Sequence, residues 1–369
     1  NCEELGNWSV NNPKLMQYNE DNFWTCSLNL NKLQKAEISY KYGIFNTEKG
    51  IFSYFEEGSD RYVQIFNSAK IKIIKNDGFV RMKSNQWHGA GVGLPVFSIR
   101  TKKSFGTGDF VDLKLLVDWA KLTGLKLIQV LPLNDTTGTH TDADVLPYAA
   151  ISAFALNPLF LNLPALGKLP ADHKLQQEYN ELQPKLNALE RVEFLQVINF
   201  KYRYAKELYL INKNKFLKNK DFRKFFKKNE YWLVPYAAYC VLRDKFGTPD
   251  YRQWNEFSKF DKNKINQITS NDSEYFDEVG TNYFIQYHLH CQLSEAATYA
   301  HENGIILKGD IPIGVNRNSV DTWVSPQLFN MHKQAGAPPD MFAIKGQNWE
   351  LPTYNWEMIK QTGFEWWKN

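Results

Sequence analysis

The sequence has no run of about 18 apolar residues, so it predicts no helix that spans a membrane. Cysteine is scarce: the four residues of this type lie far apart and form no C-x-x-C pair. Such spacing is typical of reduced, structural thiols in a cytoplasmic protein. A disulfide between Cys2 and Cys26 is the less favoured alternative.

Motifs for metals, nucleotides and phosphate are also absent. The 7 histidines show no zinc-binding spacing; His288 and His290 are two residues apart on an expected helix, where they face different directions. The glycine-rich segment Gly89–Gly93 precedes an apolar run instead of following a strand, which argues against a dinucleotide-binding loop. We therefore expect no cofactor and no bound metal.

Neither sign of charge is in strong excess. The chain has 44 Lys and Arg against 40 Asp and Glu, which argues against a dedicated nucleic-acid-binding protein. Residues 201–230 are an exception, with eleven Lys or Arg and three Asp or Glu. This stretch favours the solvated face of a helix, and a surface for an anionic partner is the less favoured alternative.

Aromatic residues are plentiful, at 15% of the chain with 11 Trp. They can fill a core or stack on sugars, and composition alone does not separate these uses. At about 150 residues per domain, the 369 residues predict two to three domains.

Residues 1–83 have the pattern of a small β-sandwich and no helical periodicity. Strands are predicted within 36–45, 62–66 and 70–74, followed by a turn at 76–78. The polar residues 83–86 predict a linker to a second domain, which we expect to span 84–369.

The second domain has an α/β pattern. Leu94–Ile99 and Leu125–Leu131 are apolar runs typical of buried parallel strands. Between them, Phe110–Leu122 repeats apolar residues at helical spacing, with Asp109 as the expected N-cap and Gly124 as the expected stop.

A second helix–glycine–strand unit comes late in the chain. Ile285–Ala300 has helical spacing, Gly304 ends the helix, and a strand begins at Ile305. Two such units indicate a parallel sheet, most economically a (β/α)8 TIM barrel, with a doubly wound sheet as the rival. A Lys-rich helical insertion at about 168–282 separates the two units.

Candidate chemistry lies at the expected strand ends, where β/α barrels place their functional side chains. Asp310 comes at such an end, and Gln347, Trp349, Tyr354 and Trp356 follow it. Acids, amides and flat rings together suit neutral sugars, because hydroxyls need polar partners and the face of a sugar ring is apolar.

Several ordered motifs resemble one family. They are PYAAISAFALNP at 147–158, KGDIPIGV at 308–315, NSVDTW at 318–323 and GAPPDMFAIKGQNWELPTYNW at 336–356. Over about 85–369 they are similar to the 4-α-glucanotransferases, the amylomaltases or disproportionating enzymes of glycoside hydrolase family 77. Leu5–Trp8 and Ser39–Tyr42 resemble a family-20 starch-binding module. The likeness is therefore to the two-part type, which has such modules in front.

The resemblance implies a (β/α)8 barrel and a retaining double displacement by two carboxylates about 5–5.5 Å apart. In the family, the nucleophilic Asp lies in an Arg-x-Asp-His-like motif, and the acid/base Glu and a supporting Asp follow it. The motif does not occur before Asn369, so we expect no catalytic carboxylate in this chain. We expect a fragment cut at both ends, with an incomplete barrel whose strands lie near 95–100, 126–131 and 305–310.

The resemblance also implies residues that bind substrate. Tyr148 matches a tyrosine near the donor sugar, and Asp310 matches an acid that braces the site. Asp340 and Phe342 match a loop over the acceptor side, although Met341 stands where Tyr is frequent. A further pair, Gln347 and Trp349, matches sugar-contacting positions.

The two-part likeness carries three residues over to the starch-binding part. Trp8 matches a stacking ring, Lys41 a nearby lysine, and Phe55 a second ring position where Trp is usual. Leu351 replaces the Asn of simpler amylomaltases, which favours the two-part subgroup.

The expected partners are α-1,4-glucans such as maltodextrin, starch and glycogen, with no nucleic acid and no membrane. The alternatives are a non-catalytic starch-binding protein and an α-glucan hydrolase. The loop Gly346–Trp349 favours transfer, since it belongs to the glucanotransferase resemblance. Oligomeric state and the preferred donor and acceptor are left open by the sequence.

The chain of 369 residues should not turn over maltotriose, because it contains no match to the nucleophile motif. The measurement is chromatography of maltotriose incubated with the chain, purified free of other enzymes. Formation of longer and shorter maltodextrins would show that a nucleophile does lie within these residues.

Overall fold

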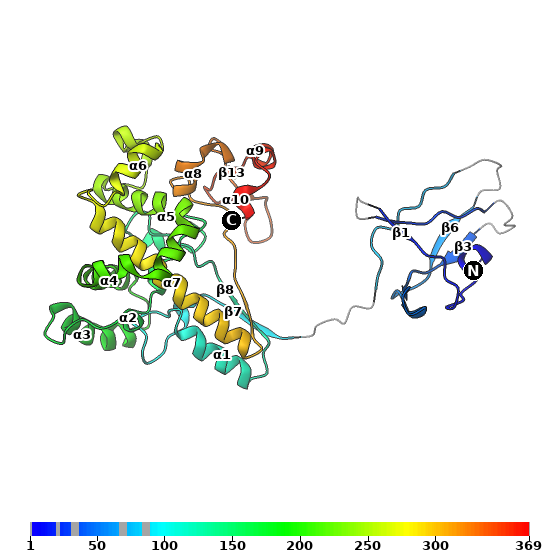
Figure 1. Ribbon diagram of the computed structural model, residues 1–369, viewed down its shortest axis with the longest axis horizontal. Helices are drawn as coiled ribbons and strands as arrows, with labels where there is room; N and C mark the ends of the chain where they lie inside the picture. Colours follow the sequence, from blue (N-terminus) through cyan, green and yellow to red (C-terminus); the bar gives the residue numbers. More distant parts are fainter. Residues whose placement is uncertain (1, 20–22, 31–36, 66–71, 83–88, 369) are drawn as a thin grey trace. The chain divides into compact units, whose positions relative to one another are not determined.

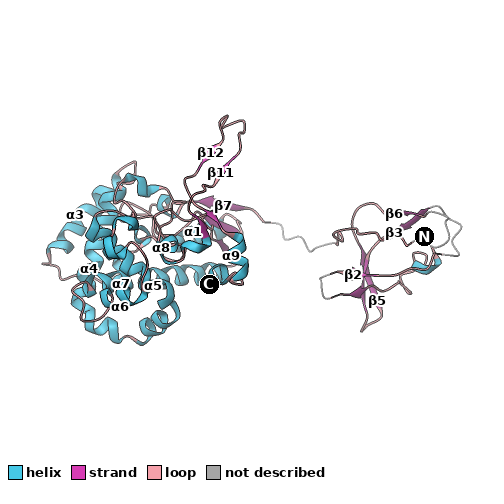
Figure 2. Ribbon diagram, turned by 90° about the horizontal axis from the view of Figure 1, so that it is seen from above, coloured by secondary structure: helices cyan, strands magenta, loops and turns pink. Residues whose placement is uncertain are grey.

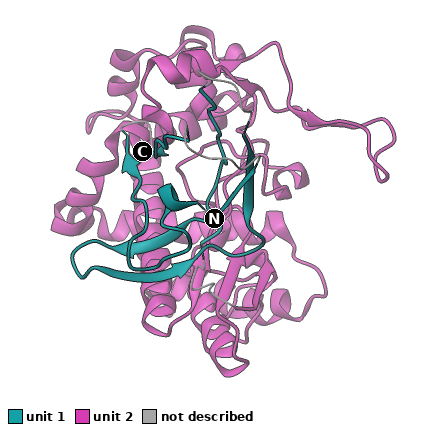
Figure 3. Cartoon of the chain, turned by 90° about the vertical axis from the view of Figure 1, so that its right-hand side faces the viewer, with its two compact units in different colours: residues 1–88 teal, residues 89–369 magenta. Residues whose placement is uncertain are grey.

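The computed structural model describes residues 2–19, 23–30, 37–65, 72–82 and 89–368. The chain divides into two compact units, residues 1–88 and 89–369 (Figure 3). In the described ranges, no helix is both long and apolar enough to cross a membrane. The predicted linker at 83–86 lies outside the described residues.

Unit 1 is built from antiparallel strand pairs. The described strands are β1 (Gln17–Tyr18) with β2 (Trp24–Thr25), β3 (Glu37–Tyr40) with β6 (Arg61–Gln64), and β4 (Gly43–Asn46) with β5 (Ile51–Phe55). A 3-10 helix at Glu3–Leu5 precedes them. The β pattern predicted for residues 1–83 is therefore confirmed for the described strands, whereas their closure into a sandwich stays a prediction.

The strand expectation for 36–45 is met by β3 and β4, which pair with different partners on either side of Lys41 and Tyr42. One strand prediction in unit 1 needs correction. The described part of the run at 70–74 forms no strand, while 70 and 71 lie outside the described residues. The segment that follows is held by a side chain instead: the guanidinium of Arg61 donates to the carbonyls of Asp77, at 3.1 Å, and Phe79, at 2.7 Å.

Unit 2 contains a three-stranded parallel sheet of β7 (Gly91–Leu94), β8 (Leu127–Val130) and β9 (Ile306–Lys308). The order is β7-β8-β9, with Leu127 opposite both Gly91 and Ile306. Helices α1 (Asp112–Leu122) and α7 (Phe276–Glu302) lie side by side next to the sheet (Figure 1). The Nζ of Lys114 on α1 forms an ion pair with Oε2 of Glu295 on α7, at 3.1 Å.

The first strand lies earlier than the sequence suggests. The run Leu94–Ile99 is predicted as a strand near 95–100, but Val96–Ser98 is a 3-10 helix. Pro95 has no N–H to donate to the ladder, so pairing stops at Leu94. The glycine-rich segment forms the strand itself, and a Cβ on Gly91 would lie only 2.6 Å from the carbonyl oxygen of Leu127.

The helix boundaries follow the expected signals closely. Both Gly124 and Gly304 have positive φ, +77° and +70°, and stand two residues beyond α1 and α7. Asp109 is not the formal N-cap, because α1 begins at Asp112. Its carboxylate still accepts hydrogen bonds from the N–H groups of Val111 and Asp112, at 2.9 and 3.3 Å.

In the sequence, a helical region lies between β8 and β9, and part of it packs against α7 (Figure 1). Its α-helices are α2 (Leu163–Leu166), α3 (Lys174–Ala188), α4 (Phe194–Lys218), α5 (Lys220–Phe246) and α6 (Lys262–Ile268). The 3-10 helices of unit 2 after Val96–Ser98 are Asp142–Val145, Pro158–Phe160, Tyr251–Gln253, Asn255–Phe257 and Pro326–Leu328.

One lysine of the basic stretch is not a solvated residue. Lys201 on α4 is 1% exposed, and its Nζ donates to the carbonyl of Leu159 at 2.6 Å. Burial lowers the pKa of Lys201 to about 8, although Asp109 and Asp112 oppose this shift. Lys201 is therefore part of the core.

The last part of unit 2 is made of short elements. They are α8 (Val320–Val324), the pair β10 (Phe329–Asn330) and β13 (Thr353–Tyr354), the pair β11 (Gly336–Ala337) and β12 (Gln347–Asn348), α9 (Trp356–Gln361) and α10 (Glu365–Lys368). The pair β11–β12 is a hairpin that projects from the rest of the unit (Figure 2).

Gly280→Ala should destabilise unit 2, although Ala in a helix is favoured over Gly by about 1 kcal/mol. A Cβ on Gly280 would lie 1.9 Å from the hydroxyl oxygen of the fully buried Tyr209. Overpacking of this kind costs about 1–3 kcal/mol or more, so the helix gain is outweighed.

Gly309→Ala is the matched control, since nothing lies within 4 Å of a Cβ there. The urea midpoint of Gly280→Ala should be lower than that of the unchanged chain. The midpoint of the control should be almost the same as that of the unchanged chain. Equal or greater stability of Gly280→Ala would contradict the packing of α4 on α7.

Candidate functional site

Tyr148 and Asp310 meet at the carboxyl end of the parallel sheet. The hydroxyl of Tyr148 donates to Oδ2 of Asp310 at 3.3 Å, although 162 residues separate them. Asp310 comes two residues after β9, and Tyr148 lies in the segment after β8. Burial, and then the negative charge of Asp310, raise the pKa of Tyr148. The phenol therefore stays a hydrogen-bond donor.

The segments that carry this pair are joined by backbone hydrogen bonds. The N–H of Asn316 donates to the carbonyl of Ala150 at 2.7 Å, and the N–H of Val320 donates to that of Ile151 at 2.8 Å. These two bonds hold the segment after β8, which carries Tyr148, against the segment after β9, which carries Asp310.

The carboxylate of Asp321 adds a further link at the junction between the segment after β8 and the segment after β9. It accepts hydrogen bonds from the N–H of Ala153 at 2.9 Å and from the indole N–H of Trp366 at 3.0 Å. Burial raises the pKa of Asp321 to about 6, and these two bonds oppose the shift. Sequence reasoning included Asp321 in a motif but gave it no role.

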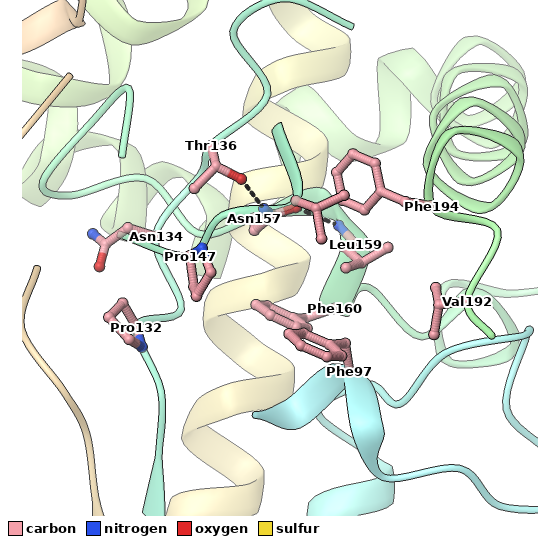
Figure 4. A pocket seen from close by; sticks show the side chains of 11 residues that line it. Phe97, Pro132, Asn134, Thr136, Pro147, Asn157, Leu159, Phe160, Val192 and Phe194 are labelled. Atoms are coloured by element: carbon pink, nitrogen blue, oxygen red, sulfur yellow. Dashed lines mark hydrogen bonds between the residues drawn. The ribbon is translucent and has the colours of Figure 1, made fainter. Parts of the chain in front are cut away.

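A pocket lies where β7 and β8 end, and its lining includes Pro147, the residue before Tyr148 (Figure 4). It contains about 500 Å³ of empty space, part of which is open to solvent. Its lining is mostly apolar, and it includes Phe97, Pro132, Asn134, Pro147 and Phe160. The pocket is therefore suited to an apolar face of a ligand.

The amides of this pocket are already used to fix its wall. Asn134 donates through Nδ2 to the carbonyl of Ala153 at 2.7 Å, and Asn157 donates to the hydroxyl of Thr136 at 3.0 Å (Figure 4). These bonds attach the wall to the same segment that Asp321 holds.

The other predicted residues of unit 2 lie together in or next to the β11–β12 hairpin. Asp340 accepts through Oδ1 from the N–H groups of Phe342 and Ala343, at 2.8 and 2.6 Å, and so shapes the tip. Phe342 is 90% exposed there. At the base, Gln347 accepts the indole N–H of Trp349 at 3.0 Å.

Among the described contacts, none joins these four residues to Tyr148 or Asp310. Among the described residues, the base of the hairpin is one place where the two groups are connected. Leu351 is buried against Gly314, where an added Cβ would lie 3.4 Å from its Cδ1. Its carbonyl accepts the N–H of Ala335 at 2.8 Å, one residue before β11.

In unit 1, the two predicted ring positions lie together. The rings of Trp8 and Phe55 are 6.1 Å apart and nearly perpendicular, and Trp8 is 41% exposed. Lys41, the third predicted residue, is 3.9 Å from the carboxylate of Asp60. An exposed indole beside a second ring can accept the apolar face of a sugar.

Sequence reasoning missed a second exposed pair of rings in unit 1. Tyr18 and Trp24 face each other across β1 and β2, with their ring centroids 5.4 Å apart. They are 56% and 61% exposed. The available signal was two aromatic residues on either side of the polar run Asn19–Asn22.

A buried ion pair supports the region around Phe55. Glu56, with a fully buried side chain, accepts hydrogen bonds from Nε and Nη2 of Arg61, each at 2.8 Å. Its Oε1 also accepts the N–H of Tyr42 at 3.2 Å, next to Lys41. Burial alone would raise the pKa of Glu56, but Arg61 and two backbone N–H groups hold it at about 2.

Unit 2 thus has a parallel β/α sheet with a tyrosine–carboxylate pair at its carboxyl end, and unit 1 is a β unit with exposed rings. The chain belongs to the 4-alpha-glucanotransferase family, whose model matches residues 94–369. A model described as a starch binding domain matches residues 1–74. The resemblance stated from the motifs is thereby confirmed.

Individual relatives agree with this assignment. The chain is 41% identical over 369 residues to the 4-alpha-glucanotransferase DPE2 of Oryza sativa subsp. japonica, covering 99% of this chain and 38% of the relative. It is 32% identical over 308 residues to a 4-alpha-glucanotransferase of Chlamydia muridarum, covering 82% and 56%. The chain thus spans between about a third and just over half of the length of these relatives.

Solved structures give the same fold. The amylomaltase from Streptococcus agalactiae in complex with acarbose matches with a TM-score of 0.62 and 25% identity, over 76% of this chain and 55% of that one. The amylomaltase from Corynebacterium glutamicum matches with a TM-score of 0.59, over 75% and 38%. At 18% identity, this second likeness concerns the fold alone.

The stability of unit 1 should fall as the pH is lowered from about 4.5 towards 2. The pKa of Glu56 is lowered from 4.5 to about 2 by folding, so its stabilisation is complete above 4.5 and lost below. The shift in the pKa of Glu56 corresponds to a loss on the order of 3 kcal/mol in the free energy of unfolding. Calorimetry from pH 7 to pH 2 measures it.

Glu56→Gln should be less stable at pH 7 and should lose this part of the pH dependence. Glu57→Gln is the matched control, an exposed neighbour on the same segment. If Glu56→Gln keeps the pH profile of the unchanged chain, another group is responsible.

Proposed function

We propose that the protein to which this chain belongs transfers α-1,4-glucan segments between maltodextrins, or to another glucan, and that this chain supplies surfaces that bind the glucan. The observation that carries the proposal is the Tyr148–Asp310 pair at the end of a parallel sheet, in a member of this family. We infer a complete (β/α)8 barrel and a retaining double displacement for the whole protein, with the catalytic carboxylates outside these residues.

On this proposal, the donor glucan binds next to Tyr148 and Asp310. The remaining lone pairs of the Asp310 carboxylate can accept sugar hydroxyls, since a carboxylate offers about four acceptor sites. Asp310 braces the sugar and does not attack it. The apolar lining of the pocket, which includes Pro147, provides a surface for one face of a sugar ring.

The hairpin would contact the acceptor side. Trp349 is 37% exposed, and its indole N–H is fixed by Gln347. Because Gln347 accepts that bond through Oε1, its amide nitrogen can donate to a sugar hydroxyl. Phe342 and Asp340 would cover the glucan from the tip of the hairpin.

Unit 1 would attach the protein to long glucans. The exposed rings of Trp8 and Phe55, and those of Tyr18 and Trp24, offer stacking surfaces away from the chemistry. A second attachment point raises the effective concentration of glucan ends at the first. On the family resemblance, Lys41 would contribute a further hydrogen bond to the glucan.

A cytoplasmic location belongs to the same proposal. The four cysteines are free in the structure, which supports a reducing compartment. We infer that α-glucans are the partners, and that neither nucleic acid nor a membrane is involved.

Product analysis of the whole protein with maltotriose tests the proposal. A ladder of longer and shorter maltodextrins, with a constant number of reducing ends, is the expected result. Reducing ends that increase with time would show a hydrolase. Binding to starch without any product would show the non-catalytic alternative, which the exposed rings of unit 1 would also suit.

In the whole protein, Trp349→Ala should reduce maltotriose turnover far more than Trp8→Ala. A misplaced sugar beside the reacting bond can cost about 100-fold. Trp8 lies in a different unit, so its loss should leave turnover of short substrates nearly unchanged and weaken binding to starch.

Initial rates with maltotriose and sedimentation with granular starch measure the two effects. Circular dichroism must first show that both variants are folded. If Trp8→Ala slows maltotriose turnover as much as Trp349→Ala does, the two units do not divide the work in this way.

A further inference from the structure

Arg317 connects the segment after β9 to the stem of the β11–β12 hairpin. Its guanidinium donates through Nη1 to the carbonyl of Met331 and through Nη2 to the carbonyl of Lys333, the latter at 3.1 Å. Both carbonyls lie just before the hairpin, whose first strand begins at Gly336. Arg317 itself comes seven residues after Asp310.

The backbone that carries Arg317 is fixed on both sides. Before it, the N–H of Asn316 donates a hydrogen bond to the carbonyl of Ala150 at 2.7 Å. After it, the carbonyl of Arg317 accepts the hydroxyl of Thr322 at 2.9 Å, within the capping box that begins α8. The guanidinium therefore acts from the same ordered segment that places Asp310 beside Tyr148.

The hairpin has few other attachments. Its strands pair with each other, from Gly336 with Asn348 to Ala337 with Gln347. Beyond this ladder the tip is exposed: Met341 and Phe342 are 86% and 90% accessible. Figure 2 shows the hairpin standing away from the unit. Its direction is thus set at the stem.

A planar guanidinium suits this task better than an ammonium group. Two donors of one rigid fork can engage two carbonyls at a fixed spacing, whereas the ammonium of lysine acts as a point charge. Fixing the carbonyls of Met331 and Lys333 fixes the two peptide planes that lead into Ala335 and β11.

We propose that Arg317 is a positioning residue, which sets the hairpin carrying Asp340, Phe342, Gln347 and Trp349 relative to Asp310. The inference rests on the proposed function, because the purpose of this geometry is to let one glucan contact both groups. On this inference, Arg317 does not contact the sugar. It acts by holding the carbonyls of Met331 and Lys333 at the stem of the hairpin.

The test uses the chain of 369 residues with Arg317→Met, which keeps the aliphatic stem, and Arg317→Lys, which keeps the charge. Arg203→Met is the matched control: its guanidinium pairs with Glu178 on the surface of the helical region. Peptide-resolved hydrogen exchange compares residues 331–351 with residues of α7. Calorimetric titration compares maltoheptaose with maltotriose, a shorter ligand that can occupy fewer sugar positions at once.

Arg317→Met should speed exchange in the hairpin ladder at least about tenfold, the factor that corresponds to the loss of a single charge-assisted hydrogen bond. Exchange in α7 should not change. Maltoheptaose should bind about tenfold more weakly, with little change for maltotriose. The Lys variant should lie between Met and the unchanged chain, and Arg203→Met should have no effect.

Unchanged exchange in the hairpin of Arg317→Met would overturn the proposal. So would equal acceleration throughout unit 2, which would make Arg317 a general stabiliser, or equal weakening of both sugars. If the unchanged chain binds neither sugar, the proposed function fails at this chain, and the exchange experiment still decides whether Arg317 fixes the hairpin.

Discussion

The buried carboxylate of Asp321 is the interaction on which the arrangement of segments around the candidate site of unit 2 depends. It joins three segments that are far apart in the sequence, through the N–H of Ala153, its own helix α8 and the indole of Trp366. A buried carboxylate is tolerated only when its oxygens are hydrogen-bonded. The same junction holds the segment of Tyr148 next to the segment of Asp310, so the candidate site is a consequence of it.

Unit 1 reaches a fixed structure by a different route. Among its described residues, Cys2 and Ile38 are the buried apolar side chains, which is a small core. The ion pair of Glu56 and Arg61 takes over part of this role, since Arg61 also holds the carbonyls of the segment after β6. The rings of Trp8, Tyr18 and Trp24, which are proposed to bind starch, are exposed and lie outside this core.

The sequence predicted features that depend on local chemistry. Gly124 and Gly304 end their helices because only glycine adopts their conformation easily, and Asp310 follows a strand as its spacing indicated. Features set by distant contacts were not predicted. The run after Pro95 is apolar but cannot pair, and Lys201 looks like a surface lysine until the fold places Asp109 beside it. The contact between Tyr148 and Asp310 required the fold as well.

The central claim is that one glucan contacts both the Tyr148–Asp310 pair and the hairpin. Hydroxyl-radical footprinting of this chain, with and without maltoheptaose, tests it most directly. The account predicts protection of Tyr148, Phe342 and Trp349, and none at Trp119, which is 47% exposed on α1. Unchanged labelling of Tyr148 and Trp349 at a saturating concentration of maltoheptaose, or protection centred on Trp119, would contradict it.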